Sequence, residues 1–511
     1  MKKELGEVTI GQLQEDMAAG ARTAVDIAEG YLTAIEAVDG ALCSVIETNP
    51  DVLAIAEQMD RERAAGQVRG PLHGIPILLK DNIDTDDRMQ TTAGSLALLG
   101  SRPAGDATVA AGLREAGAVI LGKANLSEWA NYRSSESTSG WSARGGQCRN
   151  PYDLSRNPGG SSSGSGAAVS ANLAAAALGT ETDGSIVNPS GACGIVGIKP
   201  TVGLSSRAGV IPISHTQDTV GPMARTVADA AAVLGALTVA DERDAATAAE
   251  GRKVHGDYRQ FLDADGLRGA RIGVARRGVS GYDEATDVVF EEAIRAVRDA
   301  GAEVVDPADI PTVDGKRMGE CERIVMQTEF KHGIAAYLAT RVVVDAALAQ
   351  PRSLADLIAF NEAHAEQELA LFGQEQFERS QESGPLDGEV YLEALAAGQR
   401  LAGVGGLDAV LDEHGLDALI APTGGPAWPL DPEEAGDAVH GGSSRFAAIA
   451  GYPLVTVPAG FAAQGAGAGA GSALPIGLTF MGRAWSEATL IRLAYAFERI
   501  TQVRRAPELR G

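Results

Sequence analysis

Two glycine- and serine-rich segments, separated by an alanine-rich stretch, constrain the folding of this chain more than any other feature. The first is Asn157-Pro-Gly-Gly-Ser-Ser-Ser-Gly-Ser-Gly166 and the second is Gly179-Thr-Glu-Thr-Asp-Gly-Ser185. Glycine loses more backbone entropy on folding than any other residue, so dense glycine indicates a backbone that closely approaches a ligand. We therefore predict that both segments line a binding or catalytic site. We interpret residues 167–178 between them as a closely packed helix.

The rest of the chain alternates between short apolar runs and amphipathic stretches. Residues 8–64 carry apolar side chains at helical spacing, which predicts helices capped by Thr9 and Thr23. The apolar run 75–79 is typical of a buried strand and ends on Lys80. This pattern predicts an α/β fold with helices on both faces of a sheet. Further strands are predicted at 118–121, 195–198, 271–274, 303–305, 416–420, 453–457 and 476–480, helices at 107–115, 126–132, 226–237, 283–300 and 486–500, and a charged helical layer at 316–402.

Composition excludes several classes of function. The 511-residue chain has a formal net charge of -25, which disfavours nucleic acid as a ligand because phosphates repel an acidic surface. Its four cysteines lack Cys-x-x-Cys spacing, so we expect neither a zinc site nor a disulfide framework. The N-terminus lacks a signal-peptide core, and no apolar run is long enough to span a bilayer. We expect a cytoplasmic protein that does not bind membranes.

No long linker divides the chain. We therefore expect residues 1–511 to form a single domain. The low-complexity segment 464–471 lies between two predicted strands, and we interpret it as a surface loop without chemical function.

One serine motif suggests a nucleophile. Gly160-Ser-Ser162-Ser-Gly164 matches the G-x-S-x-G elbow, which requires a preceding strand and a downstream Asp and His. Residues 149–158 are typical of a loop, which disfavours that interpretation, and His215 is the one histidine in a loop-like setting near these motifs. Whether His215 contacts substrate stays open. Cys193 is a second candidate nucleophile, although its apolar neighbours favour a buried structural thiol.

A serine nucleophile without histidine needs another base, and a neutral lysine can serve. The reference lysine pKa of about 10.4 would have to fall by roughly three units. Burial at the end of an apolar strand shifts the pKa in that direction, so Lys80 is the candidate base. A carboxylate that faced Lys80, such as that of Asp81, would oppose the shift.

Three separated motifs carry a family resemblance. They are Gly74-Ile-Pro-Ile-Leu-Leu-Lys80, Gly159-Gly-Ser-Ser162, and Gly179-Thr-Glu-Thr-Asp-Gly-Ser185-Ile with Lys199-Pro-Thr-Val-Gly203. In this order they resemble the amidase signature family, whose members hydrolyse amides with a Ser-cisSer-Lys triad. The motif core spans about residues 73–225, and weaker agreement extends to the C-terminus. The resemblance implies the amidase-signature fold, a large twisted mixed β-sheet covered by helices on both faces.

The resemblance also implies roles for individual residues. By position, Ser185 matches the nucleophile, Ser161 the bridging serine in a cis peptide, and Lys80 the base. The backbone N–H groups of Thr182, Asp183 and Gly184, with that of Ser185, would form the oxyanion hole. The implied reaction passes through an acyl-enzyme and requires no metal or cofactor. Whether Ser161 or Ser162 bridges stays open at this point.

The sequence departs from the common family pattern at three positions. Ser163 and Asp183 stand where glycine is usual, and Val187 stands where arginine often follows the nucleophile. These departures, with Gly140-Trp-Ser-Ala-Arg-Gly-Gly146, resemble the bacterial peptide amidase branch, whose members remove the C-terminal amide of peptide amides. The implied substrate is a small-molecule or short peptide amide. Arg144 is a candidate either for binding a substrate carbonyl or for bracing its loop.

Two alternative functions belong to the same family. One is a glutaminase-like subunit of a tRNA-dependent amidotransferase, which works with a partner. The other is a broad-specificity aliphatic or aryl amidase. The sequence is compatible with a monomer or a homo-oligomer.

Overall fold

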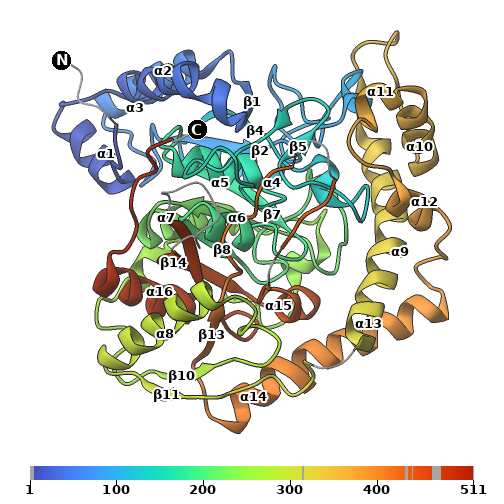
Figure 1. Cartoon of the computed structure of the whole chain (residues 1–511). Coiled ribbons are helices and arrows are strands. Elements are labelled where there is room, and N and C mark those ends of the chain that lie inside the picture. Colours follow the sequence, from blue (N-terminus) through green and yellow to red (C-terminus); the bar gives the residue numbers. More distant parts are fainter. Residues whose placement is uncertain (1–4, 314–315, 432–434, 440, 463–472, 510–511) are drawn as a thin grey trace.

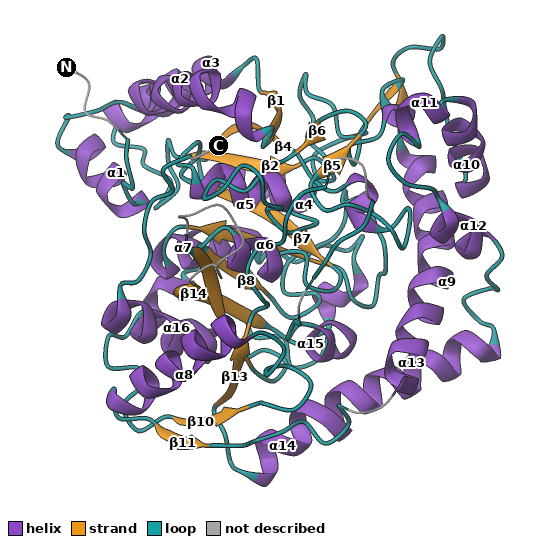
Figure 2. Cartoon of the chain, viewed as in Figure 1, coloured by secondary structure: helices purple, strands orange, loops and turns teal. Residues whose placement is uncertain are grey.

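An 11-stranded mixed β-sheet runs through the middle of the computed structural model and carries helices on both faces (Figure 1, Figure 2). The structure describes residues 5–313, 316–431, 435–439, 441–462 and 473–509. In order across the sheet, the strands are β1 (Val45–Thr48), β4 (Val119–Ala124), β2 (Pro76–Lys80), β7 (Ala176–Glu181), β9 (Thr219–Ala224), β8 (Val196–Lys199), β14 (Leu454–Ala462), β15 (Leu474–Met481), β13 (Ala418–Pro422), β10 (Arg271–Val274) and β11 (Glu303–Val305).

Strand direction changes across the sheet. Strands β4, β2 and β7 run parallel, and the pairs from β7 through to β13 are antiparallel. Every residue of β2 is buried, as expected for a strand with neighbours on both sides and helices above and below. Because β2 and β7 are adjacent and parallel, their carboxyl ends meet at one edge of the sheet. Ligands commonly bind at that edge in α/β proteins.

Helices cover the sheet in two groups. One group is continuous, because α7 contacts both α4 and α16, and α16 contacts α8. In the other group, α5 and α6 contact each other and the middle strands. The N-terminal helices α2 and α3 pack on each other, and α2 contacts β1 while α3 contacts β4 (Figure 1). The bounds are α1 Ile10–Ala18, α2 Ala24–Leu42, α3 Val52–Ala64, α4 Thr108–Glu115, α5 Ser163–Ser170, α6 Val187–Ala192, α7 Val227–Leu237, α8 Glu284–Asp299 and α16 Glu487–Thr501.

The helical layer predicted at 316–402 lies at the periphery and runs down the right side of Figure 1. It consists of α9 (Lys316–Thr340), α10 (Leu354–Ala363), α11 (Ala365–Glu368), α12 (Glu375–Gln381) and α13 (Glu389–Ala402). A π-helical turn, Gly403–Leu407, joins it to α14 (Asp408–Glu413), and α15 (Arg445–Ala450) packs on α13. Two short pairs complete the fold, β3 (Ser101–Arg102) with β12 (Val342–Val343), and β5 (Trp141–Ser142) with β6 (Gly146–Gln147).

Two predicted helices are wrong. The helix predicted at 167–178 ends at Ser170, and Asn172, with φ +59°, turns the chain into strand β7. Pairing with β2 and β9 outweighs the helical preference of alanine there. At 126–132 only the short 3₁₀ turn Glu128–Asn131 forms, because Trp129 and Ala130 have positive φ angles.

The predicted helix caps agree with the fold. Thr9 and Thr23 each cap a helix through a capping box. The segment 464–471 lies outside the described residues. None of the helices in the described part of the chain has the length and apolar character needed to cross a membrane.

Candidate active site

Lys80 ends β2 and is fully buried. Its Nζ lies 2.8 Å from Ser161 Oγ, 2.9 Å from Thr180 Oγ1 and 3.2 Å from the Thr180 carbonyl oxygen. Thr180 belongs to β7, the parallel neighbour of β2, so sheet pairing brings it to the lysine. The strand edge thus surrounds the amine with three oxygen atoms in a site closed to solvent.

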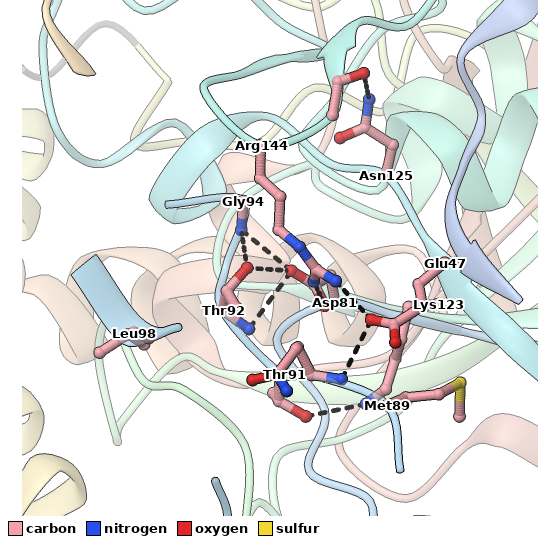
Figure 3. A network of polar contacts seen from close by, with 12 residues as sticks. Glu47, Asp81, Met89, Thr91, Thr92, Gly94, Leu98, Lys123, Asn125 and Arg144 are labelled. Atoms are coloured by element: carbon pink, nitrogen blue, oxygen red, sulfur yellow. Dashed lines mark hydrogen bonds and ion pairs between the residues drawn. The ribbon is translucent and has the colours of Figure 1, made fainter. Parts of the chain in front are cut away.

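The surroundings of Lys80 disfavour its charged form. Burial lowers the pKa of Lys80 to about 7, although Asp218 and Glu181 act in the opposite direction. Asp81 is turned toward other partners, because its carboxylate accepts hydrogen bonds from Thr92 Oγ1 at 2.6 Å and Gly94 N at 3.1 Å (Figure 3). A neutral amine is therefore accessible near neutral pH.

The first glycine-serine segment supplies Ser161 through a cis peptide bond with Gly160. Ser127 N donates to Ser161 O at 3.1 Å, and Ser162 N donates to Ser185 O at 3.1 Å. The second bond fastens the two predicted loops to each other. Lys80, Ser161 and the backbone of Ser185 consequently meet at one point of the sheet edge.

The other serines of this segment have different partners. Ser162 Oγ donates to Thr180 O at 3.1 Å and accepts from Thr180 N at 3.2 Å, which ties it to the end of β7. Ser163 Oγ donates to Gly159 O at 2.6 Å, inside its own loop. Of these three serines, Ser161 is the one in contact with Lys80.

The second segment forms a turn between β7 and α6, with φ +82° at Gly184. Glu181 Oε2 accepts the N–H groups of Ile186 at 2.7 Å and Val187 at 3.0 Å, which holds the start of α6. Within the described part of the chain, no group accepts a hydrogen bond from the N–H of Asp183, Gly184 or Ser185. Consecutive unpaired N–H groups at a turn can stabilise a developing oxyanion.

A cavity of about 480 Å³ opens beside this turn, and Gly160 and Gly184 form part of its wall. That volume suits a small ligand. One part of the wall is apolar and another is polar. The apolar part contains Val187, Val279, Val313, Met318 and Phe446, and the polar part contains Asn131, Ser139, Asp183, Asn188, Thr423 and Asp437.

Three other candidates lie elsewhere. Arg144 forms ion pairs with Asp81, at 3.2 Å, and with Glu47, so it braces its loop (Figure 3). His215 lies in a separate depression, with Nδ1 3.5 Å from Glu329 Oε2. Cys193 is buried, and burial raises the pKa of its thiol, which disfavours a thiolate.

Sequence reasoning missed several residues of this site. Thr180, five positions before Ser185, lies inside the second motif, so its place there was a usable signal. Asn131 and Ser139 lie near each other in sequence but far from Asp437, and none of the three belongs to a motif. Only the folded structure brings them together.

Comparison with known proteins places the chain in a family. The family model "Amidase" matches residues 26–491. The crystal structure of peptide amidase from Stenotrophomonas maltophilia is similar with a TM-score of 0.91 and 50% identity, covering 99% of each chain. An Arabidopsis thaliana protein named "Probable amidase" is 44% identical over 91% of this chain and 85% of its own. A glutamyl-tRNA(Gln) amidotransferase subunit from Gloeobacter violaceus is 34% identical over 97% of this chain and 96% of its own.

These similarities extend over nearly the whole chain and include the fold. The predicted fold class is therefore confirmed. The chain belongs to the amidase family and is an amidase, a hydrolase of amide carbon–nitrogen bonds.

Proposed function

We propose that this amidase removes the C-terminal amide of peptide amides and releases ammonia, with Ser185 as nucleophile, Ser161 as bridge and Lys80 as base. The observation that carries the proposal is the 2.8 Å contact between buried Lys80 Nζ and Ser161 Oγ, beside the turn that bears Ser185. The similarity to the peptide amidase of Stenotrophomonas maltophilia supports the substrate class.

The surroundings of Lys80 suit a base. A neutral amine has two N–H donors and one lone pair. Thr180 offers two acceptors, its carbonyl and its hydroxyl oxygen, at 3.2 and 2.9 Å. If both N–H groups donate to Thr180, the lone pair of Lys80 is left for the Ser161 hydroxyl proton.

The reaction then proceeds in two halves. Ser161 passes its proton to Lys80 and accepts that of Ser185, whose Oγ attacks the amide carbonyl. The resulting oxyanion accepts hydrogen bonds from the N–H groups of residues 182–185, where one donor contributes about 3–4 kcal/mol. The proton returns through Ser161 to the departing nitrogen, which leaves as ammonia from an acyl ester on Ser185. Water, deprotonated by the same relay, cleaves the ester and releases a carboxylate.

A second candidate function follows from the similarity to the amidotransferase subunit of Gloeobacter violaceus. A glutaminase-like subunit would pass ammonia to a partner in a tRNA-dependent reaction. The two functions separate when the purified chain is given a dipeptide amide without ATP or tRNA. We expect ammonia release. A chain that is inactive on peptide amides, but active on glutamine once a partner is added, would contradict the first proposal.

A panel of peptide amides, arylamides and aliphatic amides tests the substrate class. We expect the highest kcat/KM for peptide amides. Equal or higher values for simple aliphatic or aryl amides would indicate a broad-specificity amidase. We further propose a cytoplasmic location, in keeping with four unpaired cysteines.

Serine variants test the assigned roles. We expect Ser185→Ala to abolish ammonia release and Ser161→Ala to lower kcat by about 10²-fold or more, the size of a lost proton relay. Ser162→Ala is the matched control, since among the described residues its hydroxyl bonds to the Thr180 backbone and not to Lys80. Greater damage from Ser162→Ala than from Ser161→Ala, with both variants folded by circular dichroism, would show the bridging assignment to be wrong.

A further inference from the structure

Three charged residues line the cavity, and they differ in whether an opposite charge lies beside them. They are Asp183, Asp437 and Arg445. Arg445 Nε lies 3.2 Å from Glu322 Oε2 and 3.9 Å from Asp183 Oδ2, so its charge is shared between these two carboxylates. Among the described residues, no Lys, Arg or His forms an ion pair with Asp437. Within the described part of the chain, Asp437 is therefore a carboxylate on the wall without a cation beside it.

Asp437 is held in a fixed orientation by Ser139, which lies next to Gly160. Its carboxylate accepts Ser139 N at 2.9 Å and Ser139 Oγ at 2.5 Å. Burial raises the pKa of Asp437 to about 6, which leaves it ionised at neutral pH. Ser139 Oγ packs against Gly160, where an added Cβ would lie 2.7 Å from it. Asp437 is thus separated by a single side chain from the residue that precedes Ser161.

Two further polar groups on this wall lack partners. Ser139 Oγ gives its one proton to Asp437, so it must accept from Asn131 Nδ2, at 2.9 Å. This hydrogen bond identifies which atom of the Asn131 amide is the nitrogen, and it leaves Oδ1 without a partner in the described part of the molecule. The hydroxyl of Ser443, a residue only 2% exposed, is likewise unpaired among the described residues. Buried polar groups of this kind normally find a partner.

We propose that Asp437 and Asn131 Oδ1, with Ser443 Oγ, form a subsite for the positively charged α-amino group of a short substrate, an amino-acid amide or a dipeptide amide. This inference rests on the proposed peptide-amidase function. An ammonium group has three N–H donors and no acceptor, and the residues on this cavity wall supply a carboxylate, an amide oxygen and a hydroxyl as acceptors. The nearness of Asp437 to Gly160 favours an amino group close to the scissile amide over the tip of a long side chain.

Matched substrate pairs test the subsite. Leucinamide and glycyl-leucinamide are compared with their N-acetyl derivatives, which keep the scissile amide and remove the charge. We expect kcat/KM for ammonia release to be about 10- to 100-fold higher for the free amines, the effect of one charge-assisted hydrogen bond. Asp437→Asn should bring this ratio close to one. Asp263→Asn, an exposed carboxylate outside the cavity, is the matched control and should keep the wild-type ratio.

Three results would overturn the subsite. The first is equal turnover of free and acetylated pairs by the wild type, a comparison that needs no variant to fold. The second is a free-amine preference that survives in folded Asp437→Asn. The third is a loss of kcat/KM in Asp437→Asn that is as large for N-acetyl-lysinamide as for leucinamide. That result would show that the carboxylate binds the cation of a side chain. Absence of ammonia from every compound would instead contradict the proposed function itself, and the subsite with it.

Discussion

At the scale of single residues, Lys80 combines full burial with three oxygen neighbours that could stabilise either of its protonation states. Burial favours the neutral form, while Asp218 and Glu181 favour the charged form. The balance leaves its pKa at about 7 instead of the usual lysine value. A residue so poised can accept a proton in one step of catalysis and return it in the next.

The pH dependence of the reaction follows from this balance. Lys80 must be neutral to act as a base, so kcat/KM for a peptide amide should rise with pH and level off above an apparent pKa near 7. Initial rates of ammonia release between about pH 5.5 and about pH 9 measure the profile. A rate that falls as pH rises through 7 would contradict the assignment of Lys80 as the base.

Another buried lysine supplies the control for that profile. Lys123 is also fully buried, but it donates to Thr91 Oγ1 at 2.9 Å and to the Ile83 carbonyl (Figure 3). Lys80→Met should lower kcat by about 10²- to 10⁴-fold. Lys123→Met should lower the melting temperature and keep the shape of the pH profile.

At the scale of elements, α5 is packed against its surroundings through residues without bulk. Its eight residues are all buried, and the sequence Ser163-Gly-Ser-Gly-Ala-Ala-Val-Ser170 contains two glycines. A Cβ added at Gly164 would lie 2.2 Å from Ser44 O and 2.5 Å from Asn125 O, which are rigid backbone atoms. Helix α5, which follows the proposed bridging serine, therefore has no space for an added carbon at this position.

A pair of glycine substitutions tests this close packing. Gly164→Ala should lower the free energy of unfolding by about 1–3 kcal/mol or more, through overpacking. Gly40→Ala lies in α2, where an added Cβ meets no atom within 4 Å, so it should raise stability by about 0.5–1 kcal/mol through helix propensity. Chemical denaturation of both variants measures the two signs. A neutral Gly164→Ala would contradict the close approach.

The elements differ in how far the sequence predicts them. Strand β2 and the caps Thr9 and Thr23 have strong local patterns, and they form as expected. Strand β7 has no such pattern. The four consecutive alanines at residues 174–177, which lead into it, show no alternation of polar and apolar side chains, and alanine favours a helix. Its extended form comes from hydrogen bonds to β2 and β9, which lie far away in sequence.

The candidate site divides in the same way. Lys80, Ser161 and Ser185 belong to recognisable motifs, and the fold brings them to one edge of the sheet. Asn131 and Asp437 belong to none, and the fold links them through Ser139, whose hydroxyl lies next to Gly160. Residues that bind a variable part of a substrate need no fixed spacing, so no local pattern marks them.

At the scale of the whole molecule, one sheet joins distant parts of the chain. Its strands come from residues 45–48 at one extreme and 474–481 at the other, and the C-terminal strands β14 and β13 pair with β8 and β10, which come from earlier in the chain. The single domain expected for residues 1–511 stays a prediction, which we retain as a proposal. A shared sheet favours it, since few cuts would leave both parts with complete cores.

Calorimetry tests this proposal. We expect one endothermic transition, because the sheet cannot lose its C-terminal strands without exposing the core between β8 and β13. The destabilising Gly164→Ala change should move the whole transition to lower temperature without splitting it. Two resolved transitions, with the helical layer at 316–402 melting separately, would contradict a single cooperative unit.

The parallel pairing of β2 with β7 has a consequence for how activity arises during folding. Lys80 and Thr180 meet only when segments about a hundred residues apart close a long loop, and contacts of such high sequence separation form late. Helices such as α2 depend on local contacts and can form much earlier. The proposed catalytic base is therefore assembled by the slow part of folding, and we expect a refolding chain to regain its helical content before its amidase activity.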